Sequence, residues 1–361
     1  MRKRFSKSIL AWMLLALLGL SPAVIRSQSA HRSVSSDMER DFQAAMAAED
    51  RGDSKQAEAL LSKLHAAHPG IFAVNESLGL LYASQGNASR ALPLLEAAVR
   101  EQPSSDAAHA NLGAALYSLH RNHDAVAEFQ RAVHLNPSNG QEQQSFGRVL
   151  MDEHRPADAA RALTAALRIK PSDSDLELDC VTALLAADRL NDAQKMLSTF
   201  ADADHSARAQ SLLGEADEKQ GRFQSAGKHF SRAVELEPSE ENAWQLSLEL
   251  LRHWTFDAAA IELQAASAKF PDSKRMRLGL GAAYFGGTQY AKAIPVFADL
   301  LESELDNAMD AEMLGISCNA VMMEARPRCA VLVHYAEAHP KDARATAYAA
   351  ASLFDQSDSQ S

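Results

Sequence analysis

Proline recurs at a nearly constant interval along this chain of 361 residues. The prolines concerned are Pro69, Pro103, Pro137, Pro171, Pro238, Pro271 and Pro340. The shorter intervals are about 34 residues, and the two longer ones fit two units of similar length each, a period typical of stacked supersecondary units. The chain is therefore expected to fold as one repeat array.

Small residues repeat inside each unit at internal spacings of 12 and 7 positions. They are Gly79, Ala91, Ala98; Gly113, Ala125, Ala132; Gly147, Ala159, Ala166; Gly214, Ala226, Ala233. Two further sets, Ala45, Ala57, Leu64 and Gly281, Ala293, Leu300, keep the spacing but end in leucine. Seven residues are about two helical turns, whereas twelve cross into a second helix, so each unit is predicted to be a helical hairpin. The small residues let its two backbones approach closely.

Other residues are suited to packing between such hairpins or to ending their helices. Tyr82 and Leu95 are examples of the larger apolar residues expected to fill the space between units. Gly86 and Gly221 stand where a first helix must end, which suits a left-handed cap. Pro156 and Pro327 stand near the start of second helices, where a missing N–H is harmless, and the final proline of each unit closes its second helix.

The repeated pattern resembles the tetratricopeptide repeat, a helix–turn–helix of about 34 residues. Its motif is represented by Leu78-Gly79 with Tyr82, then Ala91, Leu95 and Ala98, then Pro103, and by the later copies. The resemblance implies an all-α fold, a right-handed superhelical solenoid of antiparallel helix pairs. About nine repeats are expected in residues 38–340, followed by a capping helix at 341–355 and a disordered tail at 356–361.

Some units depart from the motif. Val181 replaces the first-helix glycine of the fifth unit, and Phe200 replaces a small residue there. Asp217 stands where an apolar side chain usually packs, and a buried unpaired carboxylate would be costly. The seventh unit carries Trp244 and Trp254 and is offset by one residue, and the ninth, around Gly315 and Cys329, matches least well.

The first residues have the three regions of a secretory signal peptide. Basic residues at positions 2–7 precede an apolar run from Ile9 to Leu20, and small residues follow. Residues 1–29 are therefore interpreted as a signal peptide, or as an uncleaved anchor, and residues 30–37 as a Ser-rich linker. The chain is expected to be periplasmic or secreted, with anchoring to the inner membrane as the alternative.

Charge and composition exclude several function classes. The net charge is −11, and residues 1–29 contain five basic residues and no acid, so the remainder is more acidic still. An acidic chain lacks the positive electrostatic field that nucleic-acid binding requires, so nucleic acid is excluded as a partner. A metal site at His120 and His123 is not expected, because no third ligand lies nearby in the sequence. A glycine-rich phosphate-binding loop is not expected at Gly279, Gly281, Gly286 and Gly287, because no strand precedes them. We therefore expect no catalytic residue, metal or cofactor, and membrane contact only through the N-terminal segment if it is uncleaved.

Three cysteines leave at least one unpaired. Cys318 and Cys329 fall on the two helices of the ninth unit and are a candidate disulfide, with two buried thiols as the alternative. Cys180 lies on an apolar helix face and is expected in the core.

The resemblance implies a binding groove, because first-helix residues that do not pack between hairpins line a concave surface in this family. By matching register they are Glu76, Ser77, Leu80, Asn111, Tyr117, Gln141, Gln144, Arg148 and Met151. The amides can bond a peptide backbone, Arg148 can hold a carboxylate, and Tyr117 and Met151 offer apolar contact. Asn111 stands where several family members use asparagine, but Ser77 and Ser145 replace it in the neighbouring units.

The sequence thus favours a non-catalytic scaffold that binds a partner protein or peptide. One alternative is an accessory subunit of a separate envelope enzyme or secretion complex, for example one associated with a glycosyltransferase. Another is a structural spacer that self-associates, in which Trp244 and Trp254 would form the contact.

Overall fold

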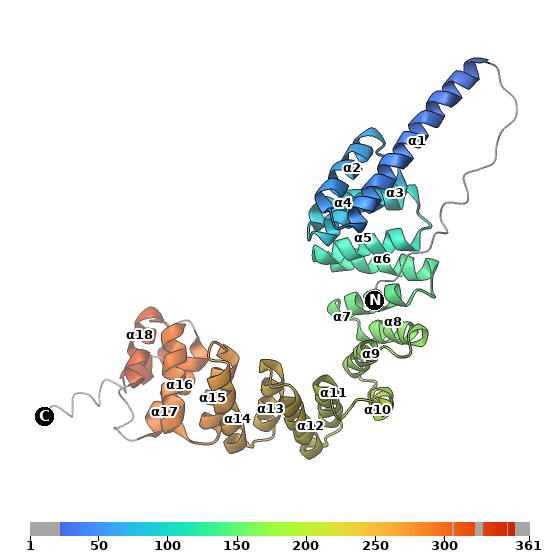
Figure 1. Ribbon diagram of the computed structural model, residues 1–361. Helices are drawn as coiled ribbons and strands as arrows, with labels where there is room; N and C mark the ends of the chain where they lie inside the picture. Colours follow the sequence, from blue (N-terminus) through green and yellow to red (C-terminus); the bar gives the residue numbers. More distant parts are fainter. Residues whose placement is uncertain (1–21, 305–306, 322–327, 345, 351–361) are drawn as a thin grey trace. The chain divides into compact units, whose positions relative to one another are not determined.

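The computed structural model describes residues 22–304, 307–321, 328–344 and 346–350, with the side chains described from residue 36 onward. These residues form helices joined by short turns, in two compact units, one ending at Glu153 and the other beginning at His154. In each unit, consecutive helices pack as antiparallel neighbours (Figure 1). The all-helical fold expected from the sequence is confirmed.

The first unit contains seven helices in its described part. They are α1 (Pro22–Asp50), α2 (Ser54–Ala67), α3 (Phe72–Ser84), α4 (Ala88–Glu101), α5 (Asp106–Ser118), α6 (Asn122–Leu135) and α7 (Gly140–Asp152). Helices α1 and α2, α3 and α4, and α5 and α6 pair as hairpins.

The second unit begins its helices with α8 (Pro156–Ile169), α9 (Ser174–Ala186), α10 (Leu190–Thr199), α11 (Ala207–Lys219), α12 (Phe223–Leu236) and α13 (Glu240–Arg252). It continues with α14 (Phe256–Lys269), α15 (Lys274–Gly286), α16 (Tyr290–Ser303), α17 (Ala308–Ala320) and α18 (Val331–Ala338). Residues 343–350 are also helical apart from position 345, which is not described, and the rest of the predicted capping helix lies outside the described residues. The count of nine repeats stays a prediction.

The periodic small residues are the places where the two helices of a hairpin meet. All the glycines and alanines of the four complete sets are buried, as are Tyr82, Gly281 and Ala293. A Cβ atom added to Gly79 would lie 2.8 Å from Leu95, and one added to Gly113 would lie 3.0 Å from Phe129. In both cases the facing side chain comes from the second helix of the same hairpin, so the glycine is needed to admit it.

Each first helix from α1 to α15 is followed by a residue with left-handed backbone conformation. The residues are Gly52, Gly86, His120, His154, Asp188, Gly221, Trp254 and Thr288, with φ between 54° and 80°. Gly86 and Gly221 confirm the predicted caps, since glycine adopts this conformation without steric cost. The second helices end where expected, two residues before prolines such as Pro103 and Pro137. Pro156 is the first residue of α8, whereas Pro327 lies outside the described residues.

Three departures from the motif have local consequences. Val181 is fully buried in α9, and α10 is short because it ends at Thr199, which leaves Phe200 buried outside the helix. Asp217 is 6% exposed but not unpaired, because Arg222 Nε donates to its Oδ1 atom at 3.0 Å. The cost of burying this carboxylate is therefore offset by an ion pair.

The N-terminal residues differ from expectation in one respect. Residues 30–37, predicted as a Ser-rich linker, belong to helix α1, which also includes residues 22–29 of the predicted signal peptide. Residues 1–21 lie outside the described part of the chain. None of the helices in the described part combines the length and apolar character needed to cross a membrane.

Candidate functional site

The predicted groove residues lie on the first helices of successive hairpins in the first unit. Helix α3 contacts α5, and α5 contacts α7, so their side chains can form one continuous face. Glu76, Ser77 and Leu80 belong to α3, Asn111 and Tyr117 to α5, and the remaining four residues to α7. We call these residues, with Asp152, the first-helix face.

Helices α3 and α5 are joined on this face by Asn111, whose Nδ2 atom donates to Glu76 Oε1 at 3.2 Å. Partial burial raises the pKa of Glu76, and the hydrogen bond from Asn111 opposes that rise. Asn111 is thus already engaged within the chain, although its carbonyl oxygen can still accept from a ligand. The Ser77 hydroxyl contacts Met46 Sδ at 3.8 Å, and Leu80 is 40% exposed.

Helices α5 and α7 are joined by Tyr117, whose hydroxyl donates to Asp152 Oδ2 at 2.5 Å. This bond is the main reason that the pKa of Tyr117 is raised, while the positive charge of Arg148 opposes the rise. The ring of Tyr117 is 38% exposed, and Arg148 is exposed. Exposed aromatic, cationic and anionic groups therefore lie together on α5 and α7.

Helix α7 does not expose every residue assigned to the groove. Gln141 is exposed and Met151 half-buried, but Gln144 is 7% exposed. Helix α7 packs against both α5 and α6, and this packing leaves Gln144 unable to present its amide to a ligand. The expectation that Gln144 lines an open groove is therefore wrong.

A buried carboxyl group lies close to this face. Glu142, in the first turn of α7, is 4% exposed, and Asn139 Nδ2 donates to its Oε1 atom at 2.7 Å. Burial, reinforced by the neighbouring charge of Asp106, raises the pKa of Glu142 to about 7. Glu142 therefore titrates near neutral pH, which its position in the sequence did not suggest.

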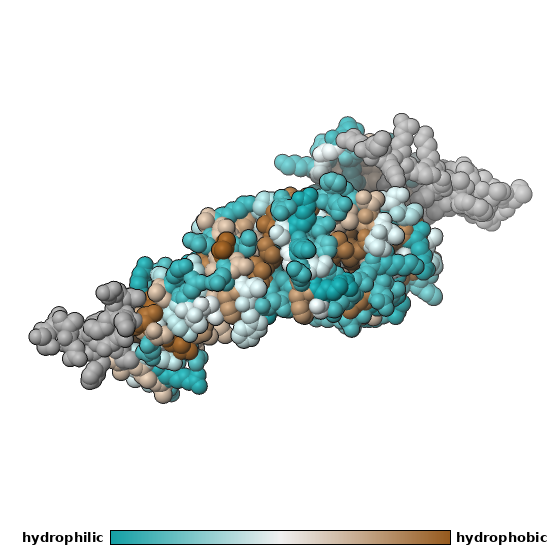
Figure 2. All heavy atoms as spheres, turned by 90° about the horizontal axis from the view of Figure 1, so that it is seen from below, coloured by the Kyte–Doolittle hydropathy of each residue, from teal (hydrophilic) through white to brown (hydrophobic). Residues whose placement is uncertain are grey.

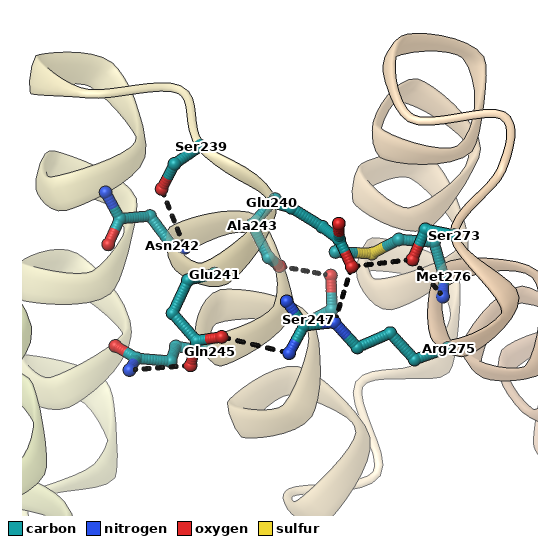
Figure 3. A network of polar contacts seen from close by, with 10 residues as sticks. All are labelled: Ser239, Glu240, Glu241, Asn242, Ala243, Gln245, Ser247, Ser273, Arg275 and Met276. Atoms are coloured by element: carbon teal, nitrogen blue, oxygen red, sulfur yellow. Dashed lines mark hydrogen bonds and ion pairs between the residues drawn. The ribbon is translucent and has the colours of Figure 1, made fainter. Parts of the chain in front are cut away.

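The second unit has similar bridges between first helices. Figure 3 shows Arg275 of α15 pointing toward Glu240 and Glu241 of α13, with Nε to Glu240 Oε1 at 2.7 Å and Nη1 to Glu241 Oε2 at 2.9 Å. Ser273 donates to the same Glu240 oxygen at 2.8 Å. These contacts lower the pKa of Glu240, so it is ionised at neutral pH. The bridge fixes neighbouring hairpins relative to one another.

One cluster was missed by the sequence analysis. Glu218 of α11, Glu249 of α13 and His253, which follows α13, bring one ligand atom each to within 4.8 Å of one another. Burial is the main reason that the pKa of Glu249 rises to about 7, and the Glu218 carboxylate adds to it. The spacing of four residues between Glu249 and His253 was a usable signal for these two residues, but Glu218 belongs to the preceding repeat and no local spacing connects it with them.

The cysteines occupy two environments. Cys318 of α17 forms a disulfide with Cys329, with a Cα–Cα distance of 6.2 Å. Cys180 is a buried thiol whose pKa burial raises to about 12, so it is unreactive.

On the face drawn in Figure 2, hydrophobic residues form separate patches among hydrophilic ones. A mixed surface of this kind suits contacts spread over many residues.

Models of the tetratricopeptide repeat match residues 42–105, 77–140, 150–216 and 245–311, which together exceed half of the chain. The chain belongs to the tetratricopeptide repeat family.

Solved structures with similar folds include other tetratricopeptide repeat proteins. One from Parabacteroides merdae is 14% identical, with 68% of this chain and 98% of that chain covered and a TM-score of 0.50. PilW, a type IV pilus biogenesis factor, is 17% identical, with 58% and 98% covered and a TM-score of 0.49. YrrB, a tetratricopeptide repeat protein with an unusual peptide-binding site, is 18% identical, with 50% and 94% covered and a TM-score of 0.46. No curated protein matched the chain.

At these identities the likeness concerns the fold alone. Tetratricopeptide repeat proteins commonly bind proteins or peptides and typically act as non-catalytic interaction scaffolds.

Proposed function

We propose that this tetratricopeptide repeat protein is an exported, non-catalytic scaffold that binds a segment of a partner protein on its first-helix face. The observation that carries the proposal is that Leu80, Tyr117, Gln141 and Arg148 are exposed on the first helices α3, α5 and α7, with Arg148 close enough to Tyr117 to influence its pKa. Half-exposed apolar groups supply contact area, while the amide and guanidinium groups fix the orientation of a bound backbone or carboxylate.

The bridges on this face favour binding by a preformed surface. Asn111 and Tyr117 are held by Glu76 and Asp152, so a ligand meets side chains that are already ordered. Ordering long side chains on binding opposes affinity by about 0.5 to 1.5 kcal/mol each, so preformed contacts lower that cost. Export to the periplasm or cell exterior, or anchoring by the N-terminal segment, remains part of the proposal on the sequence of residues 1–29.

The test is an affinity capture from envelope extract with the full chain as bait. A variant carrying Asn111→Ala, Tyr117→Ala and Arg148→Ala should lose a partner that the parent retains. A matched control carries Lys55→Ala, Arg100→Ala and His123→Ala, three exposed positions on the second helices α2, α4 and α6. The control should retain the partner, and circular dichroism should show equal helix content in all three chains.

Equal recovery with the first-helix variant and the parent would contradict the proposed face. Purified partner fragments, titrated against the same three chains, would then show whether a bound segment contacts this face directly. A reduction of at least tenfold in affinity for the first-helix variant alone is the expected result.

Self-association is a second candidate function, favoured by Trp254, which is 80% exposed and lies beside Phe256. A large exposed aromatic is typical of an interface. Light scattering on the full chain tests it, because a strict monomer at high concentration would exclude this candidate.

A further inference from the structure

The cluster of Glu218, Glu249 and His253 is the least expected feature of the second unit. Position 249 is the tenth residue of a first helix, and every equivalent position from α3 to α17 is buried. The equivalent residues are Leu81, Ala115, Val149, Ala183, Ala216, Ala283 and Ser317. A carboxylate thus stands at a position where the other repeats place a small or apolar side chain.

Glu249 also has few partners for a buried carboxylate. It is 4% exposed, and within the described part of the chain neither of its oxygens accepts a hydrogen bond. Its nearest charged neighbours are His253 Nε2, at 3.5 Å from Oε1, and the second carboxylate, Glu218. In its ionised form Glu249 would therefore need a further counter-charge to compensate its burial.

The distances from the imidazole of His253 to the two carboxylates fit one metal ion. His253 Nε2 lies 3.0 Å from Glu218 Oε2 and 3.5 Å from Glu249 Oε1. Ligand atoms about 2.0 to 2.1 Å from a tetrahedral zinc ion are separated by roughly 3.3 Å, so these distances match two edges of such a site. We propose that Glu218, Glu249 and His253 form a binding site for a divalent transition-metal ion.

The donor set indicates the class of ion. Two carboxylate oxygens and one imidazole nitrogen suit zinc and similar first-row metals, whereas magnesium and calcium prefer six or more oxygen ligands. Three protein ligands leave a fourth place for water. The ion would neutralise the two carboxylates that now face each other.

Neighbouring residues support the site and leave it accessible. The ring of Phe223 stacks on His253, with centroids 3.9 Å apart, and thereby restrains the imidazole. The side chains of Glu218 and His253 are 21% and 28% exposed, so an ion can enter from solvent on their side. Arg252 is a competing cation, but its Nη1 atom lies 4.0 Å from Glu218 Oε1 and its side chain is 56% exposed, so it can move away.

Such an ion would connect α11 with α13, the first helices of two successive hairpins. These helices already contact each other, and the ion would add a link at their C-terminal ends. The expected effect is a metal-dependent increase in the stability of this part of the solenoid, independent of any partner bound on the first-helix face.

The experiment uses the full chain after treatment with a chelator and exhaustive dialysis. Zinc sulfate is titrated by calorimetry, with a chromophoric chelator as competitor, and cobalt chloride is titrated while the visible absorption is recorded. The parent should bind one zinc ion at this site and give the absorption of tetrahedral cobalt. Glu249→Gln and His253→Gln should each weaken zinc binding at least tenfold and remove the cobalt spectrum.

His205→Gln is the matched control, because His205 lies 3.4 Å from Asp202 as an exposed pair in the same unit and is not part of a three-ligand group. It should bind zinc as the parent does. Circular dichroism monitors folding, and because His253 lies at the helix end and is partly exposed, its variant keeps the test decisive if Glu249→Gln does not fold. Failure of the parent to bind zinc, or equal binding by the parent and both site variants, would overturn the proposal.

Discussion

The hydroxyl of Tyr117 donates a hydrogen bond to Asp152, 35 residues later in the sequence and on the next first helix. The same step separates Glu76 from Asn111, Glu218 from His253, and Glu240 from Arg275. Polar side chains therefore join successive first helices at a spacing slightly longer than one repeat, in addition to the apolar packing. Two of these bridges, at Glu76 and at Tyr117, belong to the first-helix face.

Removal of the Tyr117 hydroxyl should distinguish the contribution of its hydrogen bond to Asp152 from the contribution of its aromatic ring. Tyr117→Phe is expected to lower the unfolding free energy by about 1 kcal/mol or less, because the bond to Asp152 is partly exposed. The exposed ring remains, so partner capture should be largely retained, whereas Tyr117→Ala should lose it. Denaturant titration and the capture assay measure the two effects, and equal capture losses in both variants would show that the hydroxyl, not the ring, is recognised.

A methyl group at a close helix contact should be destabilising. In Gly214→Ala the new Cβ atom would lie 2.8 Å from the ring of Phe230, so a loss of about 1 to 3 kcal/mol is expected. Gly227→Ala, in helix α12 of the same hairpin, has no atom within 4 Å and should instead gain about 0.5 to 1 kcal/mol. Hydrogen exchange of this hairpin measures both changes in stability. A loss of stability in Gly227→Ala would contradict the packing argument.

The left-handed position of Trp254 should carry a backbone cost. Its φ is 60°, a conformation that costs an L-residue about 1 to 2 kcal/mol, and glycine occupies the equivalent position at Gly86. Trp254→Gly should therefore raise the thermal midpoint, since the exposed ring makes few contacts, although the flexibility of glycine in the unfolded chain reduces the gain. Gly86→Ala, which meets no neighbouring atom, should lower the midpoint through the same backbone effect.

The pH dependence of stability should include a contribution from Glu142. Its pKa of about 7 in the folded chain exceeds the ordinary value of 4.5, so the folded state binds more protons than the unfolded state between these values. The unfolding free energy should therefore fall as pH rises from about 4.5 to 7. Glu142→Gln should reduce this slope in chemical denaturation, whereas Glu302→Gln, at an exposed position, should retain it.

The disulfide between Cys318 and Cys329 should stabilise the last hairpin. It closes a loop with a sequence separation of 11 residues, for which a contribution of about 2 to 3 kcal/mol is expected. Reduction, or the double variant Cys318→Ser with Cys329→Ser, should increase proteolysis of this hairpin. A non-reducing peptide map without a linked fragment of these two residues would contradict the pairing.

Much of the fold is determined by the sequence through the period of its small residues and prolines. Gly113 and Ala125 had to be buried, because only small side chains permit the close backbone approach that a hairpin requires. Gly86 and Gly221 likewise marked first-helix ends, because a left-handed cap favours glycine. These constraints act over one repeat, so local spacing was enough to recognise them.

Tertiary structure alone decided which polar side chains meet. Gln144 and Tyr117 both matched the groove register, yet packing buries Gln144 and leaves Tyr117 exposed beside Asp152. The spacing of Glu249 and His253 already places these two residues one helical turn apart, but only the stacking of α11 on α13 brings Glu218 to them. The physical reason is that helix periodicity fixes the face on which a side chain lies, whereas its partners across hairpins depend on how neighbouring helices are placed in space.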